Sequence, residues 1–266
     1  MSPSVRMLGT GNAFLPHGRL HSLAIVDDVH LIDAPPTVLA AVRREGIGVA
    51  SIRTVFITHV HGDHVFGFPF LLLERKYISD REGQQPLTVV TTPFGEERLR
   101  HLCQLAFPGS LDDALNRVEW RHDDIGSLDD GWSWERFRVH HEDAVEPFGY
   151  RFEHQNGANF VHSGDSGPCE NLTQAMKRSA LSILEMGFPD WVPSTHHHKP
   201  KDVEQAAKEI SSPIGITHTF IDAPSSPYPA LLDVEPMSHP RHVVHMMDGD
   251  EWKWSGQAWT HHPTLC

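Results

Sequence analysis

Cysteine, basic residues and long apolar runs are all scarce in this sequence, and each shortage excludes a class of protein. The three cysteines, Cys103, Cys169 and Cys266, lie far apart and form no CxxC pair, so we do not expect a disulfide framework. A reducing cytoplasm is the simplest setting for such a chain. No apolar run approaches the ~20 residues that cross a bilayer, so no membrane partner is expected. Residues 1–6 lack a basic region followed by an apolar one, so a secretory signal is not expected either.

Basic side chains are also few relative to acidic ones. The chain has 22 Lys and Arg against 35 Asp and Glu, which gives a formal net charge of −13 with histidine neutral. Long nucleic acids are held mainly through Lys and Arg, and the sequence contains no dense basic run. We therefore expect a small-molecule partner and no long nucleic acid.

Apolar alternation and turn residues predict a chain rich in short strands, with helices after groups of strands. The expected strands are 5–8, 21–26, 29–32, 54–57, 87–90, 148–152, 159–162, 181–184 and 214–217. The expected helices are 37–45, 66–77, 95–107 and 202–210. No shift in composition marks a linker, so we expect one domain over residues 1–266. Strands in runs with flanking helices favour an α+β fold in which two sheets pack face to face with helices outside.

Two local signals predict where elements begin and turn. Asp202 suits the N-cap of the last expected helix, because a short carboxylate can accept the free N–H groups of the first turn. Residues 243–247 and 251–254 are expected to form a hairpin around Asp248-Gly249-Asp250, which has the turn residues that such a connection needs.

The most informative stretch is Thr58-His59-Val60-His61-Gly62-Asp63-His64, which follows an apolar strand. Three imidazoles and a carboxylate fall within six positions, and these groups are usual ligands of zinc and similar divalent metals. The spacing HxHxDH suggests two metals, with His59 and His61 for one and Asp63 and His64 for the other. A His-rich surface loop is the alternative in a chain with 21 histidines, but four ligands at the end of one apolar strand favour a metal site.

Three later strands also end in a side chain that can bind metal. Residues 132–141 alternate like a strand, with an uncertain turn between its two tryptophans, and place His141 inward with His140 as the alternative. Later expected strands are followed by Asp165 in a glycine-containing turn and by His218. A single histidine after a strand is more often a rim residue than a ligand, but this order after HxHxDH strengthens the metal interpretation.

HxHxDH followed by separate His, Asp and His resembles the dinuclear pattern of the metallo-β-lactamase superfamily, over nearly the whole chain. The resemblance implies a four-layer αββα sandwich with the metals at one edge. It also implies two divalent ions, Zn²⁺ first and Mn²⁺ or Fe²⁺ as alternatives, which all tolerate His and Asp ligands. The implied ligands are His59, His61 and His141 for the first ion, Asp63, His64 and His218 for the second, and Asp165 as the bridge.

The chain is also similar to the branch that contains the tRNA 3′-processing endonuclease RNase Z, phosphodiesterases and arylsulfatases. The segments that carry this similarity are Leu8-Gly9-Thr10-Gly11-Asn12, Pro147 to Phe152, Ser163-Gly164-Asp165, and His198 ahead of the helix 202–210. Between Gly149-Tyr150-Arg151 and Asp165 there is no room for the long Gly/Pro-rich arm that holds tRNA in many members of the branch. A tRNA substrate is therefore not expected.

The expected chemistry is hydrolysis of an ester. Two divalent ions ~3.5–4 Å apart share a water and lower its pKa toward neutrality, and the bridging hydroxide attacks phosphorus, sulfur or a carbonyl carbon. Asp63 binds metal or orients this nucleophile. The resemblance implies that His198 lies near the leaving group, which an imidazole can protonate, with His197 and His196 as competitors and a mobile polar loop as the alternative. The expected carboxylate partners of the ligand imidazoles are Asp33, Glu185 and Glu142, the last of which is more simply a surface residue.

The leading hypothesis is a dinuclear metal-dependent hydrolase of small phosphodiesters or related phosphate esters. Hydrolysis of a sulfate ester, lactone or thioester on the same site is the first alternative, and a non-catalytic metal-binding protein is the alternative from another class. The intact set of ligands favours an enzyme. A homodimer is expected, because relatives in this branch are often dimers. The aromatic residues that either wall a pocket or fill the core are Phe68, Trp132, Trp134, Phe188 and Trp191.

Overall fold

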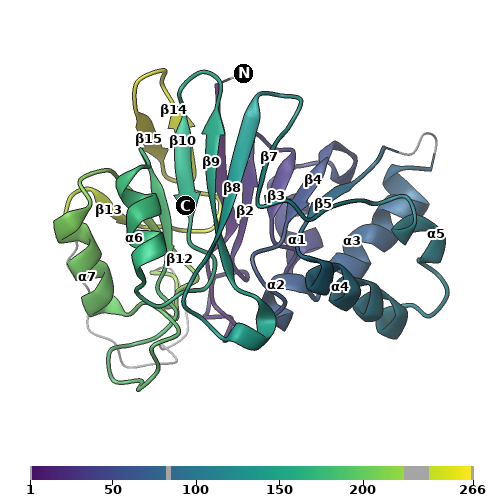
Figure 1. The fold of residues 1–266 in the computed structure, drawn as a ribbon, viewed down its shortest axis with the longest axis horizontal. Coiled ribbons are helices and arrows are strands. Elements are labelled where there is room, and N and C mark those ends of the chain that lie inside the picture. Colours follow the sequence, from purple (N-terminus) through teal and green to yellow (C-terminus); the bar gives the residue numbers. More distant parts are fainter. Residues whose placement is uncertain (1, 82–84, 225–239, 265–266) are drawn as a thin grey trace.

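Two β-sheets packed face to face form the centre of the molecule (Figure 1). The structure is a computed structural model that describes residues 2–81, 85–224 and 240–264. In this part of the chain, one sheet has eight strands, in the order β15 (Trp259–His262), β14 (Glu251–Trp254), β1 (Ser4–Gly9), β2 (Leu23–Val26), β3 (His30–Ile32), β4 (Thr54–Phe56), β5 (Thr88–Val90) and β6 (Glu119–Arg121). The other sheet has seven, in the order β13 (Val243–His245), β12 (Ile214–Thr217), β11 (Ser182–Glu185), β10 (Asn159–His162), β9 (Phe148–His154), β8 (Trp132–Arg138) and β7 (Ile125–Ser127).

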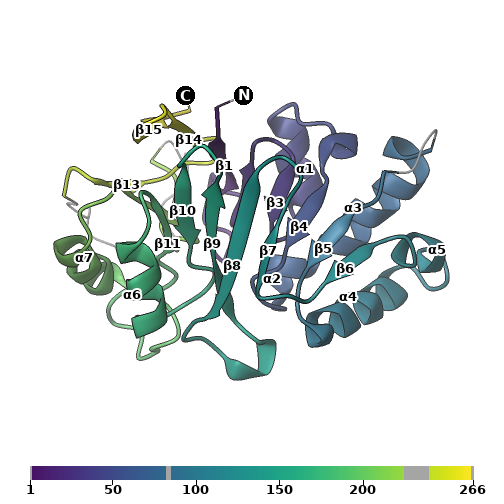
Figure 2. The ribbon, with the colours of Figure 1, turned by 45° about the horizontal axis from the view of Figure 1, so that its top comes forward.

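Helices cover the outer face of each sheet (Figures 1 and 2). The eight-stranded sheet is covered by α1 (Val38–Arg44), α3 (Phe68–Glu74) and α4 (Pro93–Ala106), and the seven-stranded sheet by α6 (Glu170–Lys177) and α7 (Pro200–Glu209). The shorter helical segments are η1 (Val49–Ser51), α2 (Gly62–Val65), the π-helical η2 (Arg75–Ser79), α5 (Asp112–Leu115) and η3 (Asp143–Val145). The layers therefore form the expected αββα sandwich. Among the described residues, no helix is both long enough and apolar enough to cross a membrane.

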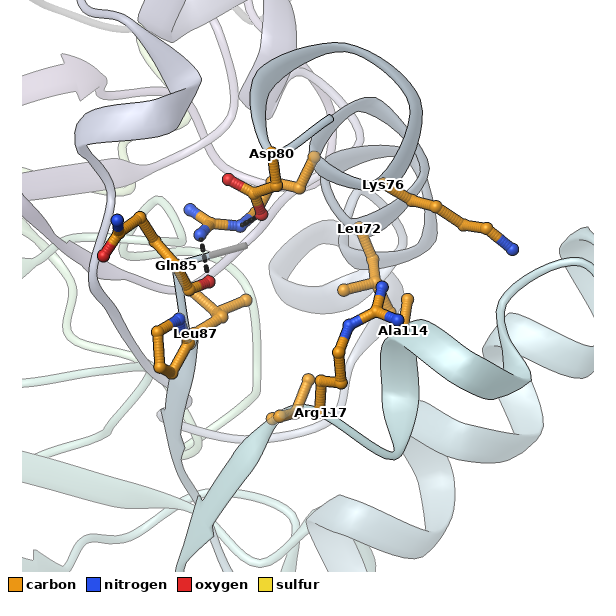
Figure 3. Close-up of a pocket in the computed structure, with 10 residues that line it drawn as sticks. Leu72, Lys76, Asp80, Gln85, Leu87, Ala114 and Arg117 are labelled. Carbon is orange, nitrogen blue, oxygen red and sulfur yellow. Dashed lines mark hydrogen bonds and ion pairs between the residues drawn. The ribbon is translucent and has the colours of Figure 1, made fainter. Parts of the chain in front are cut away.

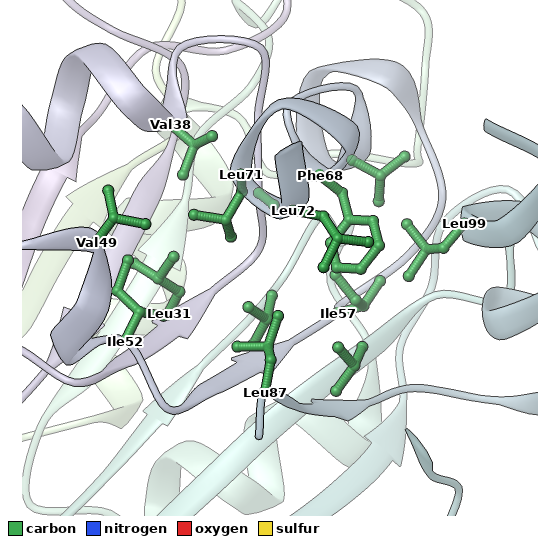
Figure 4. Close-up of a cluster of buried hydrophobic side chains, with 14 of the residues drawn as sticks. Leu31, Val38, Val49, Ile52, Ile57, Phe68, Leu71, Leu72, Leu87 and Leu99 are labelled. Carbon is green, nitrogen blue, oxygen red and sulfur yellow. The ribbon is translucent and has the colours of Figure 1, made fainter. Parts of the chain in front are cut away.

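Neighbouring residues of one strand point to opposite faces of its sheet and so belong to different apolar layers of the sandwich. In β4, Val55 packs into the cluster under α1, α3 and α4, where Phe68 and Leu71 are fully buried (Figure 4). The next residue, Phe56, faces the opposite way into the layer between the two sheets. There its ring lies 4.9 Å from the ring of Phe152, edge to face. Truncating a fully buried phenylalanine of this kind to alanine costs about 3–5 kcal/mol, so β4 is rigidly held just before the His cluster begins.

The strand β8 runs without a break from Trp132 to Arg138, so the uncertain turn between the two tryptophans does not form. Trp132 and Trp134 are buried between the sheets, and Arg136 is buried in the same alternate phase. Phe137 and Val139 belong to the other face, in the cluster that α6 and α7 cover. The strand ends at Arg138, so the chain has already left the sheet when it reaches the predicted ligand after it.

The hairpin predicted around Asp248-Gly249-Asp250 is wrong. The strand β13 pairs in parallel with β12 in one sheet, whereas β14 pairs with β1 in the other sheet, so residues 246–250 cross between the sheets. The Asp248 carboxylate accepts the Leu20 N–H at 2.7 Å, and the Asp250 carboxylate accepts the Met247 N–H at 3.0 Å, so these side chains hold a crossover. The hairpin at this end of the chain joins β14 to β15, which the sequence did not predict.

The predicted N-cap of the last helix is also wrong. The helix α7 begins at Pro200 after an extended Lys199, and Asp202 lies within the first turn. Its carboxylate accepts the Lys199 N–H at 3.0 Å, which is the reverse arm of a capping box. Proline suits the first helical position because its missing N–H has no partner there, and this moves the start two residues earlier. The strands β6 and β7 and the helix α6 were not predicted.

Candidate metal centre

All seven predicted metal ligands lie at one edge of the sandwich, where parallel strands end. The strand β4 runs directly into His59 and His61, and the short helix α2 carries Asp63 and His64. His218 follows β12 directly. Because β10, β11 and β12 are parallel to one another, as are β3, β4 and β5, their carboxyl ends meet at common edges. Sequence positions far apart are thereby brought together by topology.

Hydrogen bonds between backbone segments fix the ligand-bearing loops against each other. The Gly167 N–H donates to the His140 carbonyl at 2.8 Å, so the turn after β10 is tied to the loop after β8. Gly164 has φ +58°, and an added Cβ there would lie 2.5 Å from the Phe148 carbonyl oxygen. Glycine is thus required in the turn that carries Asp165. His218 has φ +46°, a strained value for a residue with a side chain, and such strain is concentrated at functional sites.

The first group of donor atoms comes from His59, His61, His141 and Asp165, and these atoms lie within 4.8 Å of one another. His61 Nδ1 is 3.1 Å from His59 Nε2 and 3.1 Å from His141 Nε2. Asp165 Oδ2 lies 3.8 Å from His59 Nε2. A tetrahedral zinc with bonds of about 2.0–2.1 Å to nitrogen separates its ligands by roughly 3.3 Å. The spacing of this group fits one such ion.

The second group comes from Asp63, His64, Asp165 and His218. His218 Nε2 lies 3.3 Å from both Asp63 Oδ2 and Asp165 Oδ2, and 3.4 Å from His64 Nε2. His64 Nε2 lies 3.2 Å from Asp165 Oδ1. Asp165 therefore belongs to both groups, and its Oδ1 is buried without a hydrogen-bond partner. A buried carboxylate oxygen without a donor is costly, so a cation between these residues accounts for it.

The electrostatics of the cluster favour charged carboxylates. Burial opposes charge on Asp165, but the imidazoles of His218 and His64 outweigh burial and hold the pKa of Asp165 well below its usual range. Burial, aided by neighbouring His64, lowers the pKa of His59 well below its ordinary value, so its ring is neutral as a metal ligand must be. The pKa of Asp63 is likewise lowered by His64 and His218 despite burial. The residues present can therefore hold divalent cations.

Outer hydrogen bonds orient the imidazoles. Asp33 Oδ2 lies 2.8 Å from His64 Nδ1, and the same carboxylate accepts the Thr58 N–H and the Thr58 hydroxyl, each at 2.8 Å. His141 Nδ1 lies 2.9 Å from the His196 carbonyl oxygen, to which it can donate. Each contact leaves Nε2 of the ring directed to the cluster. Asp33 thus has the partner that the sequence predicted, whereas Glu142 is exposed and behaves as a surface carboxylate.

The histidine loop before α7 requires a correction. The ring of His198 does not belong to the cluster: its Nδ1 lies 2.6 Å from the Ser166 carbonyl, and the residue lines a separate cavity between α6 and α7. His197 lies at the cluster instead, with its ring stacked 5.7 Å from that of His218. Its Nδ1 lies 2.9 Å from Glu185 Oε1, and although burial opposes protonation, this carboxylate raises the pKa of His197 to about 9. Residues 195–197 form a bend, and the sequence could not resolve which of its neighbouring side chains faces the cluster.

Figure 3 shows a separate cavity of about 270 Å³, and none of the candidate metal ligands lines it. Arg75 is buried beside it and pairs with Asp80 at 3.0 Å. The same guanidinium donates to the backbone carbonyls of Val49, Ile52 and Gln85. Through these contacts the buried Arg75 side chain links η1, η2 and the chain before β5. We therefore regard this cavity as structural.

Three kinds of comparison show which known proteins this chain is similar to. The family profile described as the beta-lactamase superfamily domain matches residues 30–217. Ribonuclease Z of Mycobacterium avium is 26% identical over 235 residues, which are 76% of this chain and 79% of that protein. A diphosphatase of the PhnP family superposes with a TM-score of 0.70 at 18% identity, covering 96% of this chain and 98% of that one. Human tRNase Z, short form, superposes with a TM-score of 0.65 at 21% identity, covering 81% and 92%.

Proposed function

The chain belongs to the metallo-β-lactamase superfamily of metal-dependent hydrolases, and on this premise we propose that it hydrolyses small phosphodiesters or related phosphate esters with two divalent ions. The observation that carries the proposal is the pair of four-residue donor groups that share Asp165. Both sheets contribute to these groups, so we take residues 1–266 as one hydrolase domain.

In this proposal His59, His61 and His141 hold the first ion, and Asp63, His64 and His218 hold the second. Asp165 would contact both, because its Oδ2 lies 3.8 Å from His59 Nε2 of the first group and 3.3 Å from His218 Nε2 of the second. Zn²⁺ suits the short nitrogen spacings, and Mn²⁺ or Fe²⁺ accept the same ligand types. When bound, the two ions supply an activated water at neutral pH and polarise the ester oxygens.

The protein side chains have distinct tasks in this reaction. Asp63 is ionised at the cluster and can accept a hydrogen bond from the attacking water, so it orients the nucleophile. Glu185 holds Nδ1 of His197, so His197 Nε2 carries the proton for the leaving oxygen. Glu185 also accepts the backbone N–H of Ser166 at 3.0 Å, which fixes this carboxylate beside the site. His197 replaces His198 as our candidate acid.

The small size of the substrate is supported by the chain between β9 and β10. These strands are joined by a tight turn in which the His154 N–H donates to the Ala158 carbonyl at 2.8 Å. No inserted arm is present between Phe148 and Asp165, a stretch that the structure describes completely. The chain also has a net charge of −13, which disfavours a long polyanion. Relatives named ribonuclease Z make RNA cleavage the competing proposal.

The test is a substrate panel on protein reconstituted with Zn²⁺, Mn²⁺ or Fe²⁺. We expect turnover of bis(4-nitrophenyl) phosphate and little turnover of matched sulfate, lactone and thioester compounds. Faster cleavage of a tRNA precursor would favour the competing proposal, and a folded protein that binds metal but turns over nothing would favour a non-catalytic role. A cytoplasmic location and a homodimer remain predictions.

A further inference from the structure

An apolar pocket of about 400 Å³ lies beside the candidate metal centre. The side chains that line it are Phe14, Pro16, Phe188, Pro189, Trp191, Val192 and Phe220. They come from three separate segments of the chain: the loop after β1, the loop after β11 and the loop after β12. Apart from the Trp191 indole N–H, none of these side chains carries a hydrogen-bonding group.

One wall of the pocket, Phe188, contacts His197 of the metal centre. The ring of Phe188 lies edge to face against the ring of His197, with 4.5 Å between centroids. Phe220 lies two residues after His218 and is buried. The pocket therefore begins one ring away from the imidazole to which we assign the leaving-group proton.

The walls of the pocket are fixed by a buried polar tie. The Asn12 amide nitrogen donates to the Gly187 carbonyl at 2.9 Å, and the Phe14 N–H donates to the Asn12 side-chain oxygen at 3.0 Å. The rings of Phe14 and Phe188 stack 6.0 Å apart at 29°. The loop after β1 is thus held against the loop after β11, so the pocket exists before any ligand binds. Preformed apolar concavities of this size are typical of small-molecule sites.

Two aromatic side chains at the mouth of the pocket are largely exposed. Trp191 is 68% exposed and Phe14 is 57% exposed, although each borders a concave apolar surface. Leaving such surface in water is unfavourable. Binding of an apolar ligand group that covers it is therefore favourable. A group that needs hydrogen bonds, such as a nucleobase, would lose its contacts with water and find few partners here.

We propose that this pocket binds an uncharged, planar hydrocarbon group, such as an aryl ring, that is attached to the leaving oxygen of the substrate. The proposal rests on the proposed function, because His197 defines the leaving-group side. It narrows the substrate class to aryl-type phosphodiesters and makes Trp191 and Phe14 specificity residues.

The first experiment measures binding to metal-loaded protein by calorimetry. The probes are the O-methyl, O-phenyl and O-(2-naphthyl) esters of methylphosphonate, with the O-uridinyl ester as the nucleoside probe. We expect the 2-naphthyl ester to bind at least roughly tenfold more tightly than the methyl ester, because each buried methylene-sized group strengthens binding severalfold. Trp191→Ala should remove most of this difference while the metal content is unchanged. Tyr77→Ala is the matched control, since Tyr77 is 55% exposed on η2 and does not line the pocket.

The second experiment separates this inference from the proposed function. Metal-stripped protein is mixed with 2-naphthol, and saturation-transfer NMR reports contact with the ligand. A signal that Trp191→Ala or Phe14→Ala abolishes supports the pocket even if no ester is hydrolysed. Equal affinity for all four phosphonates, tightest binding of the uridinyl ester, or an unchanged Trp191→Ala profile would overturn the proposal. A change in oligomeric mass without a change in ester preference would overturn it too, since a second copy of the chain would then be the occupant.

Discussion

Asp33 offers a sharp test of how the second metal is held, because its carboxylate touches one proposed ligand only. Asp33 is 2% exposed and contacts His64 Nδ1 and two donors of Thr58. In Asp33→Asn one carboxylate oxygen becomes an NH₂ group, which either faces the Thr58 donors or faces His64. In the second case it favours the His64 tautomer with its proton on Nε2, the atom directed to the metal.

The expected magnitude follows from the role of such outer carboxylates. Their loss weakens metal binding by roughly 10–100-fold, which corresponds to about 1.4–2.7 kcal/mol. The affinity for the second ion should fall by this amount. The affinity for the first ion, held by His59, His61 and His141, should be unaffected. Titration against a competing chelator, with metal content measured by mass spectrometry, resolves the two steps.

Asp130→Asn is the matched control, because Asp130 also pairs with a buried histidine. Its Oδ2 lies 2.6 Å from His30 Nε2, and neither residue belongs to the donor groups. This substitution should lower stability and leave both metal affinities unchanged. If Asp33→Asn bound two ions as tightly as the original protein, our assignment of His64 as a ligand oriented by Asp33 would be wrong.

Three further outcomes follow from the same geometry. In steady-state kinetics, His197→Ala should lower kcat by roughly 10²–10⁴-fold with metal content retained, whereas His198→Ala should lower it far less. A larger loss of kcat in His198→Ala than in His197→Ala would make His198 the candidate acid again. Gly164→Ala should reduce metal content and lower the thermal midpoint, because its new Cβ would meet the Phe148 carbonyl oxygen; unchanged values would contradict this close approach. Burial lowers the pKa of His162 to about 4, so it is neutral when folded and its contribution is complete above its unfolded pKa of about 6.5. Between pH ~6.5 and ~4, metal-stripped protein should then lose about 3 kcal/mol more unfolding free energy than metal-stripped His162→Gln does, measured in urea.

The sequence indicated which side chains lie together in the cluster, whereas their role as metal ligands stays a prediction. HxHxDH is local, so its four side chains could be grouped without knowledge of the fold. His141, Asp165 and His218 were grouped by their order after strands and by resemblance, and the structure brings their donor atoms together. Two packed sheets with helices outside followed from the strand runs, and the family resemblance implied the four-layer αββα order.

The failures of prediction concern contacts between distant segments. The Asp248-Gly249-Asp250 turn looks like a hairpin locally, but its carboxylates accept the N–H groups of Leu20 and Thr264 outside the turn, and the chain crosses to the other sheet. The choice between His197 and His198 depends on which side of a loop faces Glu185, and no periodicity encodes that. Of the aromatic residues left open, Trp132 and Trp134 fill the core, whereas Phe188 and Trp191 line the pocket.

Anomalous diffraction from crystals of zinc-reconstituted protein tests the central claim most directly. Our account predicts two peaks about 3.5–4 Å apart, one among His59, His61 and His141 and one among Asp63, His64 and His218. Asp165 should contact both. A single peak, or two peaks of which either lies outside these residues, would contradict the proposal of a dinuclear hydrolase.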